Sequence, residues 1–181
     1  MKMLLFKIFL FLNFSLNSMQ IIDYNNPKEN SFNNDWELIT DEVMGGISTG
    51  YFEYINSGNK GYYRLKGRVS TQHNGGFIQF RSKINLGNDS FTKIKLMVRG
   101  SGDSYQVHLR TQFTILPWQY YFASFKTSEE WNLIEIPLSE FKKSHKLQPS
   151  KFDSNEIKTL GFVAIGKDFD AQLDVTGIEL N

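Results

Sequence analysis

A period-two alternation of apolar and polar residues is the feature that most constrains how this chain can fold. Apolar side chains take every second position over several stretches, with Lys, Arg, Gln or Ser between them. Successive side chains of a β-strand point to opposite faces, so a sheet with one buried and one solvated face produces this alternation. The pattern predicts antiparallel strands, and it is clearest in segments 62–70, 92–100 and 104–112.

Further strands are predicted where β-branched and aromatic residues gather between clusters of Gly, Asn, Asp and Ser. The run LGFVAIG at 160–166 is apolar throughout, which predicts a strand that lies centrally between layers. Gly177 predicts a bulge in the last strand. Only 137–145 can hold a short helical turn. The further strands are 36–40, 51–55, 77–84, 119–125, 131–136, 160–165 and 172–180.

About ten short strands separated by turn signals predict an all-β fold, a jelly-roll β-sandwich of two antiparallel sheets. The length of 181 residues fits one domain, and a hydrophobic content of 40% is enough for a real core. We place this domain at residues 36–181 and expect a polar N-terminal arm at 19–35.

Residues 1–18 predict a secretory signal peptide, because an apolar run follows Lys2 and small Ser18 ends it. An uncleaved anchor is the alternative. A mitochondrial presequence is less favoured, since the segment has no Arg. We therefore expect an exported protein of the periplasm, the cell envelope or the medium, which is not an integral membrane protein after cleavage.

Composition argues against several classes of function. A net charge of +1 gives no reason to expect nucleic acid as a partner, and the absence of cysteine excludes thiol catalysis and Cys-based zinc sites. The three histidines, His73, His108 and His145, form no close ligand pair. The sequence therefore predicts no metal and no cofactor.

The segment GISTG at 46–50 matches the G-x-S-x-G motif of hydrolases, but its context does not. A nucleophile elbow needs a helix after the serine, whereas strand-forming aromatic residues follow here. We therefore predict that the protein is not an enzyme. A carboxylate-based enzyme is a weaker alternative, because carboxylates are scattered at Asp41, Glu42, Asp103, Glu135 and Asp174.

Polar and aromatic residues on neighbouring strands are the candidate binding residues. His108 and Arg110 lie on the polar side of their strand, where either a ligand or only solvent can meet them. Trp118 can stack on a sugar ring or pack against a protein, but Trp118 and Trp131 are more typical of core residues. The full candidate set is Gln79, Arg81, His108, Arg110, Trp118 and Tyr120.

Two glycine pairs, in DEVMGGIS and HNGGF, predict places where the backbone needs freedom from Cβ atoms. We expect Val43 and Met44 to enter the core, while Asp41 and Ser48 satisfy exposed amides. In the functional alternative, both loops meet at one rim and form a recognition edge. The loop residues are Asp41, Met44, Gly45, Gly46, Ser48, Gly75 and Gly76.

Several blocks appear in an order that resembles one family, the complex I intermediate-associated proteins. They are DEVMGGIS, Gly67-Arg68, NGGF with Arg81 close behind, VRGSGDSY followed by Leu109-Arg110, WQYYF, WNLIEIPLSEF and the closing GIEL. The resemblance covers about Trp36 to Leu180. It implies a galactose-binding-like fold and a binding or chaperone-like role in assembling NADH:ubiquinone oxidoreductase.

Three functions therefore stay open. A protein-binding module that acts in assembly comes first, a carbohydrate-binding module of the cell envelope second, and a carboxylate enzyme last. A concave polar face around Arg81 and Arg110, near Trp118, favours the carbohydrate. A flat or convex apolar patch favours a protein partner.

Overall fold

The computed structural model describes residues 18–22, 36–57 and 60–181. Residues 1–17 of the predicted signal peptide and residues 23–35 of the predicted arm lie outside the described residues. Within the described ranges the chain forms short 3₁₀ turns and β-strands but no α-helix. The 3₁₀ turns are η1 (Asp41–Met44), η2 (Gln72–Asn74), η3 (Leu138–Glu140) and η4 (Ser154–Glu156).

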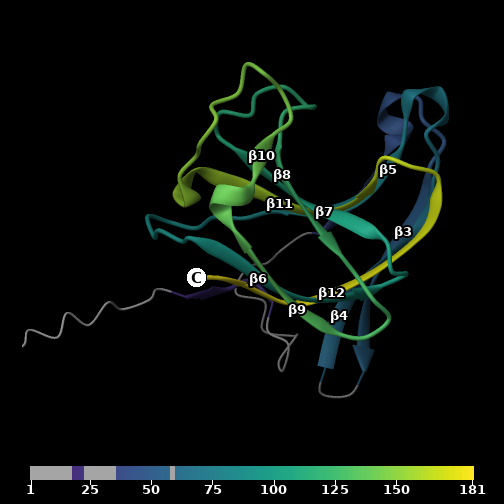
Figure 1. Ribbon diagram of the computed structural model, residues 1–181, viewed down its shortest axis with the longest axis horizontal. Coiled ribbons are helices and arrows are strands. Elements are labelled where there is room, and N and C mark those ends of the chain that lie inside the picture. The colour runs from purple at the N-terminus through teal and green to yellow at the C-terminus, as the bar shows by residue number, and fades with distance from the viewer. Residues whose placement is uncertain (1–17, 23–35, 58–59) are drawn as a thin grey trace, which may run out of the picture.

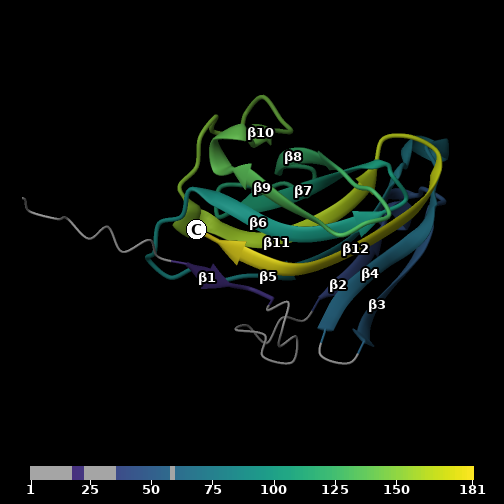
Figure 2. The same cartoon turned by 60° about the horizontal axis from the view of Figure 1, so that its bottom comes forward.

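The strands pair into two antiparallel sheets that face each other (Figures 1 and 2). One sheet has the order β3-β4-β12-β6-β9, with β1 added beside β12, and the other has the order β10-β8-β7-β11-β5-β2. The all-β sandwich is thus confirmed. The strands are β1 (Met19–Gln20), β2 (Glu37–Thr40), β3 (Thr49–Ser57), β4 (Lys60–Val69), β5 (Phe77–Lys83), β6 (Lys93–Gly100), β7 (Ser104–Thr111), β8 (Tyr121–Lys126), β9 (Asn132–Pro137), β10 (Lys142–Lys143), β11 (Ile157–Ile165) and β12 (Phe169–Leu180).

The predicted alternation places side chains as expected. Leu65 of β4 and Leu96 of β6 are fully buried, and so is Leu109 of β7. The bulge in β12 is confirmed, because the register against β6 shifts between Thr176 and Glu179, with Gly177 at a φ of 55°. Such burial of one side-chain face of each sheet is the main stabilising term of a sandwich.

Strand β11 explains why its sequence is apolar throughout. It lies centrally in its sheet, between β7 and β5. Leu160 and Phe162 belong to the core, whereas Gly161, Val163 and Ile165 line a groove on the outer face of the sheet. One face of β11 therefore packs in the core, and its other face forms part of a candidate binding site.

The N-terminal boundary of the domain differs from the prediction. Met19 and Gln20 form β1 and pair with Leu180 and Glu179 at the end of β12, although we expect them in the polar arm. Ile21 and Ile22 are fully buried in the core. The pairing joins segments that lie far apart in the sequence, and no local pattern reveals it.

Two tryptophans predicted for the core lie elsewhere. Trp118 is 54% exposed, and Trp131 is half-buried outside the core. The guanidinium carbon of Arg99 lies 4.8 Å from the centre of the Trp131 ring, so this tryptophan covers a charged side chain. The core prediction is wrong for both, and Trp36 packs against the core instead.

Candidate binding groove on the outer face of one sheet

A groove of about 670 Å³ lies on the outer face of β5, β11 and β7. Its floor is the sheet itself, and loops rise from the sheet at both ends (Figure 1). One wall carries Val43 and Met44 of η1, and the other carries Pro117, Trp118 and Ser144. The predicted polar strand face is thus concave, which is the shape that favours a small ligand over a flat protein interface.

The floor of the groove is open because Gly161 has no side chain. Gly161 pairs with Arg81 of β5 on one side and with His108 of β7 on the other. A Cβ atom at this position would lie 3.1 Å from Cβ of Arg81, so any larger residue narrows the groove. The next row brings Gln79 beside Val163. The sheet register therefore gathers four of the predicted residues, Gln79, Arg81, His108 and Arg110, around one floor.

His108 does not lie on a solvated face, as one interpretation of the sequence suggests. It is only 9% exposed, because the ring of Tyr120 stacks on it at 4.0 Å between centroids. Burial lowers the pKa of His108 to about 3. Nε2 lies 2.8 Å from Oε1 of Gln106 and donates to this acceptor in the neutral ring. His108 is thus a neutral part of the floor at physiological pH.

The two arginines of the floor have different partners. Nε of Arg81 donates to Oε1 of Glu37 at 2.8 Å. Nη2 of Arg110 donates to the carbonyls of Thr114 and Leu116 at 2.8 and 3.1 Å. These bonds tie the wall loop to the floor. Burial, with the nearby charge of Arg81, lowers the pKa of Arg110 from its ordinary value.

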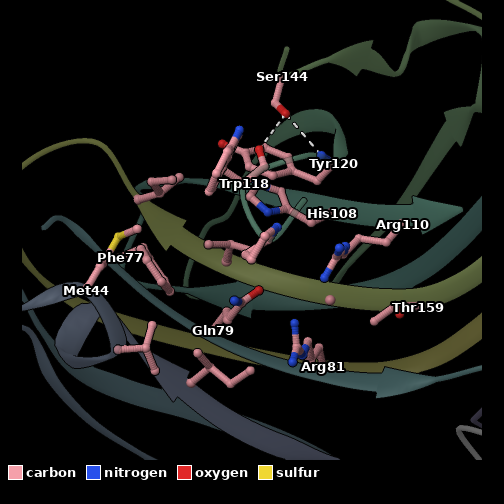
Figure 3. Close-up of a pocket in the computed structure, with 16 residues that line it drawn as sticks. Met44, Phe77, Gln79, Arg81, His108, Arg110, Trp118, Tyr120, Ser144 and Thr159 are labelled. Carbon is pink, nitrogen blue, oxygen red and sulfur yellow. Dashed lines mark hydrogen bonds between the residues drawn. The ribbon is translucent and has the colours of Figure 1, made fainter. Parts of the chain in front are cut away.

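Ser144 fixes the aromatic wall. Its hydroxyl donates to the carbonyl of Trp118 at 2.9 Å and accepts from the backbone N–H of Tyr120 at 3.0 Å (Figure 3). Trp118 is therefore held at the backbone while its indole stays exposed beside the groove. An exposed, anchored tryptophan at a groove wall can stack on a ligand ring.

The two glycine loops meet at Asp41, which forms a carboxylate clasp between them. The fully buried Asp41 accepts from the N–H and the hydroxyl of Ser48 at 2.9 and 2.6 Å, and from the N–H of Gly76. Burial alone raises the pKa of Asp41, but these bonds and one from Phe77 outweigh it and hold the pKa below its ordinary value. The amides that it satisfies are buried, not exposed as predicted.

The glycines permit this clasp in two ways, as the sequence predicts. Gly45 and Gly76 have φ values of 86° and 125°, which L side chains rarely adopt. Gly46 and Gly75 have no such angles, but a Cβ on either would lie 2.2 to 2.3 Å from the carboxylate of Asp41. Both pairs thus have the geometry that the structural interpretation of the sequence expects.

Val43 and Met44 are not in the core, so that prediction is wrong. They are 75% and 58% exposed. The turn η1 directs the carboxylate of Asp41 inward, where donors from both loops satisfy it, and the apolar side chains that follow point outward. Met44 reaches the groove and forms part of its wall (Figure 3).

The candidate catalytic groups do not form a site. Ser48 is buried, its hydroxyl is bonded to Asp41, and β3 rather than a helix follows it. Asp103 pairs with Lys167, Glu135 with Lys93 and Lys95, and Asp174 with Arg64 and Arg99. No Asp or Glu is among the described residues that line the groove.

The residues that the structure describes contain neither a cluster of metal-binding side chains nor a membrane-spanning helix. No cluster of three or more His, Asp or Glu side chains there can hold a metal ion. None of these residues belongs to an apolar helix of membrane-spanning length.

Sequence reasoning missed several lining residues, notably Thr159, Gly161 and Val163 of β11 and Ser144. One signal for Gly161 exists, because a glycine inside an apolar strand marks a site of close approach. Ser144 has no such signal, since its bonds join distant segments of the chain.

The two-sheet sandwich with a groove over one sheet defines this protein as a galactose-binding-like β-sandwich module. The chain belongs to the family described as complex I intermediate-associated protein 30, whose model matches residues 22–175. This confirms the family resemblance. A search of curated proteins found no match.

Solved structures with the same fold include carbohydrate-binding modules of Clostridium thermocellum. The family 11 module of the cellulosomal cellulase Lic26A-Cel5E has a TM-score of 0.69 at 14% identity, covering 92% of this chain and 95% of that one. The same type of module in complex with a β-1,3-1,4-mixed-linked tetrasaccharide has a TM-score of 0.67 at 14% identity, covering 90% and 94%. The family 30 module of Cel9D-Cel44B has a TM-score of 0.62 at 11% identity, covering 92% and 98%. At these identities the likeness concerns the fold alone.

Proposed function

We propose that this protein is a non-catalytic binding module whose groove holds a carbohydrate. The observation that carries the proposal is the concave shape of the floor around Gln79, Arg81 and Arg110, with the indole of Trp118 exposed at its wall. A sugar presents C–H faces to an aromatic ring and hydroxyl groups to amide and guanidinium groups. The groove offers both kinds of surface.

The dimensions of the groove suit a small ligand. Its volume of about 670 Å³ falls within the range of about 300–1,000 Å³ that is typical of ligand sites. The partly exposed apolar side chains of Phe77 and Ile165 supply contact area, while a few polar groups supply direction. The fold supports the proposal only by analogy, since one structural neighbour was solved with a tetrasaccharide.

Affinity electrophoresis of the full chain through gels that contain single polysaccharides tests the proposal. We expect at least one polysaccharide to retard the protein and Trp118→Ala to weaken retardation at least about tenfold, as for a central aromatic contact. Leu133→Ala is the matched control, because Leu133 is 59% exposed on the other sheet. Unchanged retardation of the Trp118 variant contradicts a sugar site at this wall.

A protein partner is the second candidate, favoured by the exposed apolar side chains of both groove walls. Val43 and Met44 line one wall, and exposed Ile47 follows them in the same loop. The exposed side chains of Phe113, Ile115 and Leu116 belong to the loop that leads into Pro117 and Trp118 of the other wall. The family description points to proteins associated with complex I intermediates, so a partner in assembly fits these walls. The double variant Phe113→Ser, Ile115→Ser changes exposed side chains that do not line the groove, so in this case it weakens protein capture and leaves polysaccharide binding in place.

Export is part of the proposal. Residues 1–18 direct the chain out of the cytosol, and cleavage follows near Ser18. A glycan of the cell envelope is then within reach of the groove, whereas a mitochondrial location is less favoured.

A further inference from the structure

The charges around the groove are of one sign. Arg81 and Arg110 line it, and the described lining residues contain no carboxylate to balance them. His108 adds no charge, because its burial keeps the ring neutral. Glu37 pairs with Arg81 but is not among the lining residues. The groove therefore presents an excess of positive charge to whatever enters it.

Arg110 carries a donor that is not satisfied. Its Nη2 bonds two carbonyls of the wall loop, but its buried Nε has no hydrogen-bond partner among the described residues. A buried charged donor without an acceptor costs free energy, and native structures usually supply the partner through a ligand or water. Because Arg110 lines the groove, an acceptor that binds there is a candidate partner for its guanidinium group.

Arg81 and Arg110 approach the same place from opposite sides of β11. Figure 3 shows their guanidinium groups pointing toward each other across the strand, where Gly161 leaves the floor bare. Like charges repel at this distance, and the charge of Arg81 adds to burial, the larger cause, in lowering the pKa of Arg110. An anion bound between the two guanidinium groups offsets this repulsion, because it is attracted to both of them.

We propose that the ligand is an acidic saccharide, and that a uronic acid carboxylate binds between Arg81 and Arg110. This inference rests on the proposed carbohydrate function. A planar carboxylate has two oxygens that match the fork of N–H donors on a guanidinium. The terminal nitrogens of Arg81 make no hydrogen bond to the residues described, so they are available for one oxygen. Gln79 and the indole of Trp118 then contact the rest of the sugar.

Calorimetric titration of the full chain with matched oligosaccharides tests this specificity. The probes are oligogalacturonate, its methyl ester, an alginate oligomer, a sulfated oligosaccharide and a neutral mixed-linked β-glucan. We expect an acid form to bind at least about tenfold more tightly than its ester or the neutral glucan, as for charge-assisted hydrogen bonds. This preference should shrink as salt is added, because salt screens charges.

Variants locate the carboxylate. Arg81→Gln and Arg110→Gln should each reduce the preference for the acid form at least about tenfold. If Arg110→Gln fails to fold, Arg81→Gln alone decides the test. Of the two arginines, only Arg110 makes hydrogen bonds to the loop of Thr114 and Leu116. Arg68→Gln is the matched control, because Arg68 is more than half exposed on β4 of the other sheet.

The outcomes separate the two proposals. Equal binding of the acid and its ester overturns the carboxylate site and leaves the carbohydrate function standing. Preference for the sulfated probe alone overturns the uronic acid assignment. No binding of any saccharide overturns both proposals.

Discussion

The clasp at Asp41 gives the sharpest test of how the glycine loops are held. Replacing Asp41 by Ala leaves the buried N–H groups of Ser48 and Gly76 without their acceptor. Each unpaired buried donor costs about 1–3 kcal/mol. The hydroxyl of Ser48 also loses its shorter hydrogen bond and keeps only the carbonyl of Ser70 at 3.3 Å. We therefore expect the free energy of unfolding to fall by about 3–5 kcal/mol, a large loss for a single domain.

The assay is urea denaturation of the full chain at neutral pH, followed by tryptophan fluorescence and far-UV circular dichroism. Glu42→Ala is the matched control, because Glu42 is exposed in the same turn η1. Its effect should stay within about 0.5 kcal/mol. If Asp41→Ala shows the same small change as this control, the carboxylate does not hold the loops and the reasoning is refuted.

The clasp also predicts a dependence on pH. The pKa of Asp41 is lowered in the folded state, so its carboxylate contributes stability above the ordinary pKa of Asp. That stability is lost as pH falls through the folded pKa, which protonates the clasp. The difference in stability between the wild type and Asp41→Asn should thus be constant from neutral pH to about pH 4 and shrink below it.

Four further predictions concern other parts of the chain. Gly46→Ala and Gly75→Ala should each cost more than about 1 kcal/mol in urea denaturation, because the added Cβ meets the carboxylate of Asp41. Asp174→Asn should destabilise by about 3 kcal/mol or more, since it leaves two partly buried arginines without their charged partner; an unchanged midpoint contradicts this. The pKa of His108 is lower in the folded than in the unfolded state. The stability that its neutral form contributes is therefore present above about pH 6.5 and declines from there toward pH 3. NMR titration should show a neutral His108 ring at pH 6. N-terminal sequencing of the native protein should find cleavage near Ser18, and an intact Met1 in the cytosol contradicts export.

The parts of the fold that sequence reasoning captured depend on local periodicity. The alternation in β6 requires one buried face wherever its partners lie, so Leu96 and Val98 are predictable without a structure. The same alternation places Arg81 and Arg110 on the polar face of their strands. It cannot find β1, because the pairing of Met19 with Leu180 joins segments that lie far apart in the sequence.

The wrong predictions for Val43, Met44 and Trp118 share one physical cause. A hydropathy pattern ranks each side chain by its own polarity and takes no account of the hydrogen-bond partners that the fold supplies. Val43 and Met44 look more suited to the core than Asp41, yet the carboxylate is buried because donors from two loops satisfy it. Trp118 is exposed for the complementary reason, since bonds of Ser144 hold its backbone at the groove wall. Neither arrangement has a signature in a single stretch of sequence.

The groove and the apolar side chains beside it answer different questions about function. The floor belongs to strands, so Gly161 and its neighbours are held by hydrogen-bond ladders on both sides and offer a ligand a fixed shape. The loops beside the groove also carry apolar side chains outside its lining, and exposed Ile115 offers apolar area to a larger partner. A variant of the floor such as Arg81→Gln should therefore alter saccharide selectivity, and a variant outside the lining such as Ile115→Ser should alter only protein capture. If Ile115→Ser abolishes saccharide binding in a folded protein, the loop and the groove act as one site and this division is wrong.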